Sequence, residues 1–165
     1  MKARLILICL LLLTTACGFH LRGSQLAEFD INNIYVNPSS APKLAKEVKS
    51  QLSGAGVTLS DSQKGAAYIV TLKEERFDKS ILSVSADTGK VEEYELLYSA
   101  KMDAKHADGR NIIENDRISL ARDFTFDENA VLSKFSEEGI LQEDLVRRSA
   151  SQVLRRLQAL LPASK

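Results

Sequence analysis

The clearest pattern along the chain is an alternation of apolar and polar residues between positions 93 and 105. The apolar series consists of Tyr94, Leu96, Tyr98, Ala100, Met102 and Ala104. The polar series consists of Glu93, Glu95, Ser99, Lys101, Asp103 and Lys105. A period of two residues predicts a β-strand with one buried face and one face in water, as in an antiparallel sheet.

Three further segments have the composition of strands: residues 31–37, residues 66–72 and residues 112–126. The second of these is apolar on both sides, which predicts a central position in the sheet. It can continue as far as Val84, with an irregularity near Asp78 and Lys79. Turn-forming residues at 87–90 and 108–109 separate the later strands and predict two hairpins.

Two segments have the periodicity of an amphipathic helix. The first presents Leu44, Ala45, Val48 and Leu52 on one face. Ser40 is its expected N-cap, and Gly54 is expected to end it. The second is expected to follow Gly139 and run to Leu161, before Pro162. Its apolar stripe contains Val146, Ala150, Val153, Leu154, Leu157, Leu160 and Leu161.

The order of these elements is strand, helix, three strands and helix. It predicts an α+β fold, a two-layer α/β sandwich in which two helices pack on one face of a mostly antiparallel four-stranded sheet. Leu141 and Leu145 lie outside the apolar stripe of the last helix. Either the connection before that helix folds back over them, or they contact a partner.

The first 17 residues follow a different pattern. Lys2 and Arg4 precede an uninterrupted apolar run at 5–13, and small residues then lead to Cys17. The run is much shorter than the roughly 20 residues of a membrane-spanning helix, so it predicts an export signal. It resembles a bacterial lipoprotein signal, in which residues 1–16 are removed and Cys17 is acylated. An ordinary signal peptide that contains a cysteine is the alternative.

After this signal, residues 17–30 are expected to form a short lipidated segment and residues 31–165 a single α/β domain. Acylation by two or more chains gives stable membrane anchoring. Gly18 follows the cysteine where an Asp would favour retention at the inner membrane, so the outer membrane is expected. The lack of a long Ser/Gly/Asn tether predicts that the domain lies close to the membrane or to an integral membrane partner.

The charge of the chain limits its partners. Removal of Lys2 and Arg4 from 22 basic residues leaves 20, against 22 acidic residues, for a net charge of −2. Nucleic acid is therefore not an expected partner, because proteins that bind it carry a basic footprint. Cys17 is the only cysteine after the signal, since Cys9 is removed with it, so no disulfide is expected within the domain.

No arrangement of residues in the sequence favours catalysis. His20 and His106 are far apart and have no metal-ligand spacing around them, so no metal site or other cofactor is expected. The serines lack the sequence contexts of known nucleophiles, and Gly54 and Gly56 end a helix instead of opening one around a phosphate. We therefore expect a protein that is not an enzyme.

Two segments carry a resemblance to the LptE family of outer-membrane lipoproteins. One is the lipidated start at 17–23, and the other contains Arg122, Phe124, Phe126, Asp127, Leu132, Glu138 and Leu141, followed by 155–157 near the end. The resemblance implies a lipoprotein that assists the folding of an LptD-like β-barrel, plugs its lumen and takes part in lipopolysaccharide assembly at the cell surface. An auxiliary lipoprotein of a periplasmic ABC-type lipid transport system is the alternative.

Lipopolysaccharide carries phosphates and acyl chains, so a site for it should combine cations with exposed apolar groups. Four cations lie at expected strand ends or connections and are candidates for binding it: Lys134, Lys90, Arg110 and Lys79. Lys134 is the preferred candidate, because it lies in the family-like segment between Leu132 and Phe135. The alternative for each of them is a solubilising charge on a loop.

Overall fold

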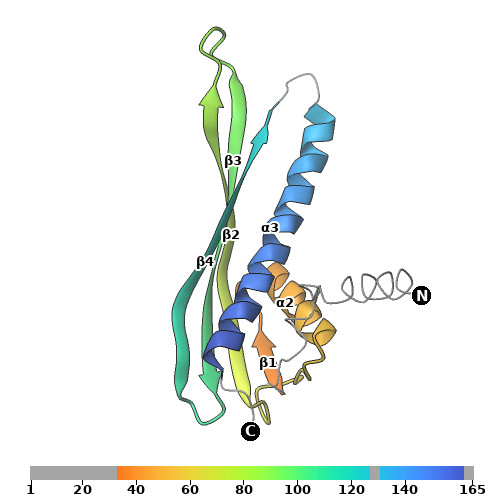
Figure 1. Ribbon diagram of the computed structural model, residues 1–165, viewed down its shortest axis with the longest axis vertical. Coiled ribbons are helices and arrows are strands. Elements are labelled where there is room, and N and C mark those ends of the chain that lie inside the picture. Colours follow the sequence, from red (N-terminus) through yellow and green to blue (C-terminus); the bar gives the residue numbers. More distant parts are fainter. Residues whose placement is uncertain (1–32, 127–130, 162–165) are drawn as a thin grey trace, which may run out of the picture.

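A computed structural model describes residues 33–126 and 131–161, with the side chains of residues 131–136 left out. The described elements are β1 (Ile34–Asn37), α2 (Pro42–Gly54), β2 (Tyr68–Val84), β3 (Val91–His106), β4 (Asn111–Thr125) and α3 (Val131–Leu160). The strands form one sheet in the order β1-β2-β3-β4, in which β1 is parallel to β2 and the other neighbours are antiparallel. The two helices cover one face, which confirms the predicted α+β fold (Figure 1).

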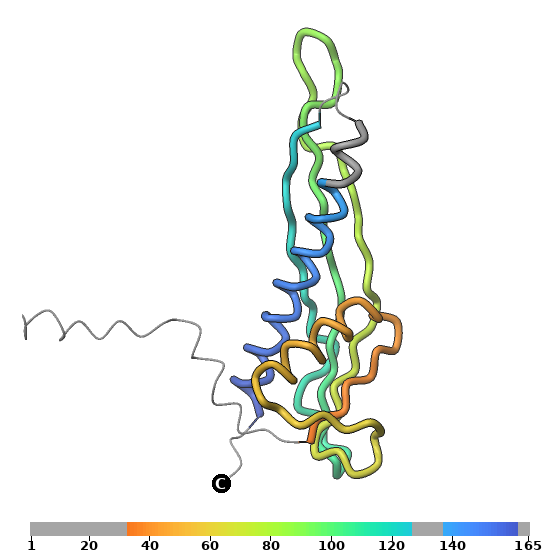
Figure 2. The backbone as a smooth tube through the Cα atoms, turned by 90° about the vertical axis from the view of Figure 1, so that its right-hand side faces the viewer, coloured from red at the N-terminus to blue at the C-terminus, as the bar shows by residue number. Residues whose placement is uncertain are grey.

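The molecule is elongated along the strands. The turn between β2 and β3 lies at the upper end in Figure 1, and the turn between β3 and β4 lies with β1 at the lower end. The β2–β3 hairpin extends past the upper ends of both helices, as Figure 2 also shows. We call residues 80–93 the upper hairpin. The helices therefore cover the lower and middle parts of the sheet and leave the upper hairpin outside the two-layer core.

The core confirms the facing predicted for β3. Leu96, Tyr98, Ala100, Met102 and Ala104 are all buried in one apolar cluster. The buried residues of α2 belong to the same cluster and are Leu44, Ala45, Val48 and Leu52, as predicted. Burial of a large aliphatic side chain contributes about 1.5–3 kcal/mol, so this continuous cluster is the main source of stability that the described residues provide.

β2 is central and continues to Val84, as predicted, but its irregularity is not near Asp78 and Lys79. The register with β3 shifts between Lys73 and Arg76, where Glu74 has a φ of 56°, and it shifts again between Ile81 and Val84. The loop before α2 fixes the bulge at Glu74, because the backbone N–H of this residue donates to Ser40 Oγ at 2.8 Å. The position of this bulge cannot be predicted from composition alone, because the bulge depends on a loop more than 30 residues away in sequence.

The same bulge supplies the cap of α2, so the prediction of Ser40 as N-cap was wrong. The N-cap position is Ala41, which makes no side-chain cap. Instead, the Glu75 carboxylate accepts hydrogen bonds from the backbone N–H groups of Lys43 and Leu44, both at 3.0 Å. The Tyr98 hydroxyl donates to the same carboxylate at 2.9 Å. A negative charge at a helix N-terminus is favourable, and here it joins α2 to two strands.

α3 also begins earlier than predicted, at Val131, and Gly139 lies inside it. Leu145 is fully buried, and Leu141 packs at the edge of the core. Arg156, three helical turns beyond Leu145, donates to the Arg117 carbonyl oxygen of β4 at 2.9 Å. This side of α3 therefore faces β4, so the strand helps to account for the burial of Leu145.

Candidate functional site

The lipidation site predicted at Cys17 lies outside the described residues, together with the signal at 1–16 and the segment at 17–30. Acylation of Cys17 therefore stays a prediction. In the part of the chain that the structure describes, no helix combines the length and the apolar composition needed to cross a membrane.

Lys79 is the predicted lipopolysaccharide contact whose surroundings the structure describes most fully. It projects from the upper part of β2, and its Nζ pairs with Glu138 Oε2 of α3 at 2.7 Å. The same Nζ lies over the rings of Tyr94, at 4.4 Å, and Phe124, at 5.2 Å. An ammonium group over aromatic faces is stabilised electrostatically. Lys79 thus joins α3 to the sheet, and any contact with lipopolysaccharide remains a prediction.

Lys90 and Arg110 lie at opposite ends of the molecule. Lys90 is exposed at the tip of the upper hairpin, and Arg110 is exposed at the turn between β3 and β4. Arg110 donates to Asp108 from its backbone N–H, at 3.0 Å, and from Nε, at 2.7 Å, and these bonds lower the pKa of Asp108 to about 2. β3 joins the two turns and has 16 residues. At about 3.3 Å per residue the tips are roughly 50 Å apart, so one phosphate group cannot contact both.

Lys134 belongs to the first turns of α3, and its side chain lies outside the described residues. Its helix begins toward the upper end of the molecule (Figure 1). Lys79 pairs with Glu138 of the same helix, and Lys90 lies in the turn between β2 and β3. The four predicted cations therefore do not form one site. Three of them occupy positions toward the upper end, and Arg110 stands alone at the lower end.

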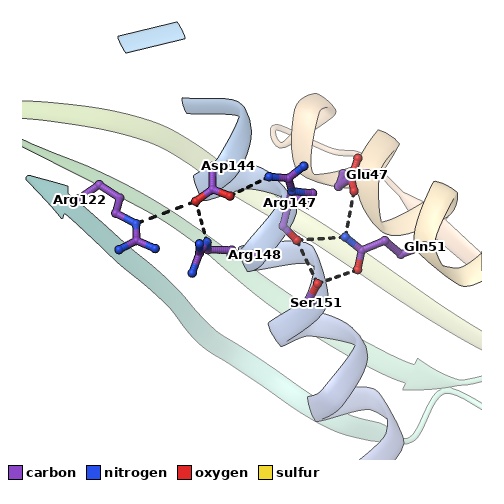
Figure 3. Close-up of polar contacts among 7 residues, drawn as sticks. All are labelled: Glu47, Gln51, Arg122, Asp144, Arg147, Arg148 and Ser151. Carbon is purple, nitrogen blue, oxygen red and sulfur yellow. Dashed lines mark hydrogen bonds and ion pairs between the residues drawn. The ribbon is translucent and has the colours of Figure 1, made fainter. Parts of the chain in front are cut away.

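A second polar centre joins β4 to α3, and the sequence analysis missed it (Figure 3). Asp144 accepts from Arg147 Nη2 at 2.8 Å and from Arg148 Nε at 2.6 Å, and its Oδ2 lies 3.9 Å from Arg122 Nε on β4. The hydrogen bond from Arg147, assisted by Arg148, holds the pKa of Asp144 below its usual range. The spacing Asp144, Arg147, Arg148 is the helical i, i+3, i+4 pattern and could have been found in the sequence. The contribution of Arg122 depends on the tertiary fold.

A polar link also joins α3 to α2. Gln51 Nε2 donates to the Arg147 carbonyl oxygen at 3.0 Å, and Ser151 Oγ donates to Gln51 Oε1 at 3.0 Å (Figure 3). Next to it, a cavity of about 520 Å³ opens between the helices. Its walls mix apolar and charged side chains from Lys43, Lys46, Glu47, Phe77, Gln142, Glu143, Val146 and Arg147. This lining has both signs of charge and does not select an anion over a cation.

Of the two histidines, only His106 lies among the described residues, and it contacts two neighbouring side chains. His106 Nδ1 lies 3.1 Å from Asp108 Oδ1, and its ring packs edge-on against Tyr68 with centroids 5.3 Å apart. Residues 33–126 and 137–161 contain no group of three or more potential metal-ligating side chains. His20, the other histidine, falls outside the described residues.

Comparison with known proteins identifies the family. The LptE family, described as lipopolysaccharide-assembly, matches residues 30–157, which is most of the chain. The chain belongs to the LptE family. It is also similar to the LPS-assembly lipoprotein LptE of Photorhabdus laumondii, with 27% identity over 156 residues that cover 93% of this chain and 84% of that protein. A role in lipopolysaccharide assembly follows from this membership.

Solved lipoprotein structures share the LptE-like fold. The solution structure of an uncharacterized lipoprotein B from Nitrosomonas europaea superposes with a TM-score of 0.71 and 25% identity, covering 86% of this chain and 91% of that one. The rare lipoprotein B of Shewanella oneidensis gives a TM-score of 0.64 at 23% identity, covering 76% and 94%. A minor lipoprotein of Acinetobacter baumannii gives 0.62 at 24% identity, covering 80% and 95%. These likenesses support the two-layer fold.

Proposed function

We propose that this LptE-family chain is an outer-membrane lipoprotein that assists the folding of an LptD-like β-barrel, plugs its lumen and thereby takes part in lipopolysaccharide assembly. The lipid on Cys17 would hold it at the periplasmic leaflet, with the domain inside the lumen or in the periplasm. The role is one of binding and shape, with no bond made or broken. The observation that carries this proposal is the family match across residues 30–157.

The shape and surface of the domain support a plug. An elongated sheet with a helix layer along its axis matches the long dimension of a barrel lumen better than a spherical domain would (Figures 1 and 2). Its hairpin turns carry exposed polar residues, including Asp87, Lys90, Asp108 and Arg110. Polar turns are compatible with the water-filled interior of a large barrel.

Direct binding of lipopolysaccharide forms part of the proposal. Lys134, Lys90 and Lys79 are the candidates toward the upper end, and Arg110 is the separate candidate at the lower end. Cations on exposed positions bind phosphate through screened Coulomb attraction, so affinity should fall as the salt concentration rises. Lys90→Asp and Lys134→Asp should each weaken binding and reduce this salt dependence. Lys49→Asp, at an exposed position on α2, is the matched control.

The partnership is tested by purification of the full-length lipoprotein from detergent-solubilised membranes. Recovery of a large outer-membrane β-barrel in stable complex is the expected result, and depletion of the lipoprotein should lower barrel levels and surface lipopolysaccharide. Recovery of an inner-membrane complex, with barrel and surface lipopolysaccharide unchanged on depletion, would contradict the proposal. That result would favour the auxiliary lipoprotein of an ABC-type lipid transport system.

A further inference from the structure

Three arginine side chains converge on one carboxylate where α3 meets β4 (Figure 3). Arg148 Nε donates to Oδ2 of Asp144 at 2.6 Å, and Arg122 Nε lies 3.9 Å from the same oxygen. Arg147 donates to the other oxygen, Oδ1, at 2.8 Å. One negative charge therefore faces three positive charges, so these four side chains together carry an excess of two positive charges.

Arg147 is the best compensated of the three arginines. Its pKa is raised by the hydrogen bond to Asp144 first, and further by the nearby carboxylates of Glu47 and Glu143. Glu47 lies on α2, so Arg147 belongs to the side of α3 that faces the other helix (Figure 3). The excess charge thus lies mainly with the other two arginines, which share Oδ2 of Asp144.

Arg122 has an unusual position for a charged residue. It lies on the helix-facing side of β4, where its neighbours Leu120 and Phe124 are apolar. Its register partner on β3 is the buried Leu96. Within the described residues its guanidinium donates no hydrogen bond and has only the long ion pair with Asp144, although its side chain is 41% exposed. A guanidinium has five N–H donors, and these remain available to a group from outside the chain.

Arg148 is the neighbour of Arg122 at this junction. Its side chain is 56% exposed, and in the described part of the chain it uses only Nε, in the bond to Asp144. Guanidinium groups bind phosphate through paired N–H···O bonds, so two neighbouring groups can hold one phosphate. A phosphate monoester carries a charge of about −1.5 to −2 at pH 7 and matches the excess of two, whereas a carboxylate carries a single negative charge.

The sheet register relates this pair to a predicted lipopolysaccharide contact. Lys79 of β2 pairs with Leu96 of β3, which in turn pairs with Arg122 of β4. The two cations therefore occupy one row of the sheet, two strands or about 10 Å apart. Lys79 is neutralised by Glu138 at 2.7 Å, whereas Arg122 has no close carboxylate of its own among the described residues. On this row, Arg122 is the cation better able to bind an external anion.

We propose that Arg122 and Arg148 bind a phosphate group of lipopolysaccharide, which rests on the direct binding included in the proposed function above. The phosphate would accept N–H donors from both guanidinium groups on the solvent side of the α3–β4 junction. Asp144 is then a positioning residue, because it holds both side chains beside the site and does not contact the ligand. The site adds two arginines to the four cations selected from the sequence.

The first test measures the binding of purified lipopolysaccharide to the full-length lipoprotein in detergent at physiological salt. Arg122→Gln, Arg148→Gln should raise the Kd by about tenfold or more, since two charge-assisted contacts are lost. The matched control is Arg117→Gln, Arg155→Gln, which removes the same charge from exposed positions on the same strand and helix and should keep the Kd within about twofold. Equal weakening in both double variants, or none in either, would overturn the inference.

A conservative variant separates the geometry of the site from its charge. Arg122→Lys, Arg148→Lys keeps both positive charges but removes the planar fork of the guanidinium, so it should recover only part of the lost affinity. Circular dichroism and chemical denaturation should show that all three double variants keep the fold. Full recovery by the lysine variant would overturn a site built on paired guanidinium contacts.

The second test removes the phosphates from the ligand. Dephosphorylated lipopolysaccharide should bind the unmodified protein and the Arg122→Gln, Arg148→Gln variant with similar Kd, and a preference that survived dephosphorylation would overturn the inference. Intact lipopolysaccharide that binds both proteins equally, while inorganic phosphate distinguishes them, would assign the site to free phosphate instead. A variant that loses the barrel but keeps its affinity for lipopolysaccharide would assign the arginines to a carboxylate of the partner.

Failure of this inference can be told apart from failure of the proposed function. If the unmodified protein does not bind lipopolysaccharide at all, direct binding fails and takes the phosphate site with it. The barrel partnership is then still decided by its own purification experiment. If lipopolysaccharide binds but the glutamine variant binds it equally well, direct binding stands and only the assignment to these two arginines is wrong.

Discussion

The lower part of the domain and the upper hairpin are built from the same two strands but owe their stability to different interactions. In the lower part, β2 and β3 lie between β1 and β4 and beneath two helices, and their inward side chains are buried. In the upper hairpin, β2 has no strand on its outer side among the described residues, and Ile81, Leu82 and Val84 are exposed. The difference indicates that the lower part supplies the folding energy, whereas the upper part is available for contacts.

The largest expected effect is in the lower part. Leu96→Ala removes a fully buried side chain that faces the helices and should lower the free energy of unfolding by about 2–5 kcal/mol. Chemical denaturation of the domain measures the loss. Ile81→Ala is the matched control on the same sheet face, because residue 81 pairs in register with Tyr94 but is exposed. Equal losses at the two positions would contradict the division into a core and an exposed hairpin.

The next largest effect is expected at the bulge that separates the two parts. Glu75→Ala removes the acceptor for two helix N–H groups and the Tyr98 hydroxyl, so the free energy of unfolding should fall by about 1.5–3 kcal/mol. Glu74→Ala is the control one residue away, since its exposed carboxylate only pairs with Lys101, at 2.7 Å. A loss at residue 74 as large as at residue 75 would show that the bulge backbone, and not the cap, is responsible.

The contact between Tyr98 and Glu75 also predicts how the unfolding free energy changes at high pH. Burial, together with the nearby Glu75 carboxylate, raises the pKa of Tyr98 above its ordinary value. Because the folded state holds this proton more tightly than the unfolded state, the stabilising effect is complete below about pH 10 and is lost as the pH rises further. Tyr98→Phe should therefore flatten the decline of unfolding free energy above pH 10. If the unfolding free energy of Tyr98→Phe fell above pH 10 with an unchanged slope, other groups would be responsible for the decline.

A smaller effect is expected at Asp144, where α3 meets β4. Its lowered pKa means that its ion pairs stabilise the fold above the unfolded pKa of about 3.9 and are lost as the pH falls. Asp144→Asn should reduce the unfolding free energy at pH 7 by less than about 1 kcal/mol and flatten its decline below pH 4. Glu143→Gln, at the adjacent exposed position, is the control for a change in net charge. If the unfolding free energy of Asp144→Asn fell below pH 4 as steeply as that of the unmodified protein, the ion pairs of Asp144 would not be the cause of the decline.

The smallest effect on stability is expected in the upper hairpin. Leu82→Lys changes an exposed side chain and should alter the unfolding free energy by less than about 0.5 kcal/mol. Thermal and chemical unfolding of the isolated domain provide the measurement. A loss of several kcal/mol would show that the hairpin packs in the free protein more tightly than its exposure indicates.

The features predictable from the sequence were those set by local periodicity. Alternation placed the buried face of β3 correctly, and helical spacing placed the buried face of α2. The start of α3 differs from the predicted one, because Gly139 predicts a boundary whereas a long helix packed against a sheet and a second helix tolerates a glycine. The cap from Glu75 could not be predicted, since it joins residues more than 30 positions apart.

The candidate site shows the same limit. Sequence reasoning selected four cations by their positions at expected strand ends and connections, but Arg110 is separated from the others by the length of β3. Lys79 already has a partner in Glu138, which lies 59 residues away in the sequence. Spacing along the chain reports which residues share a strand or helix face. It does not report which charges from different elements are already paired.

The parallel pairing of β1 with β2 has a consequence for the order of folding. β2, β3 and β4 follow one another along the chain and pair as neighbours, so they can form from contacts close in sequence. β1 pairs only after the chain has closed a loop of about 30 residues that includes α2. In a chain delivered N-terminus first, β1 and α2 emerge before the strands that bury them. The N-terminal part of the domain is therefore the segment that waits longest for its native contacts.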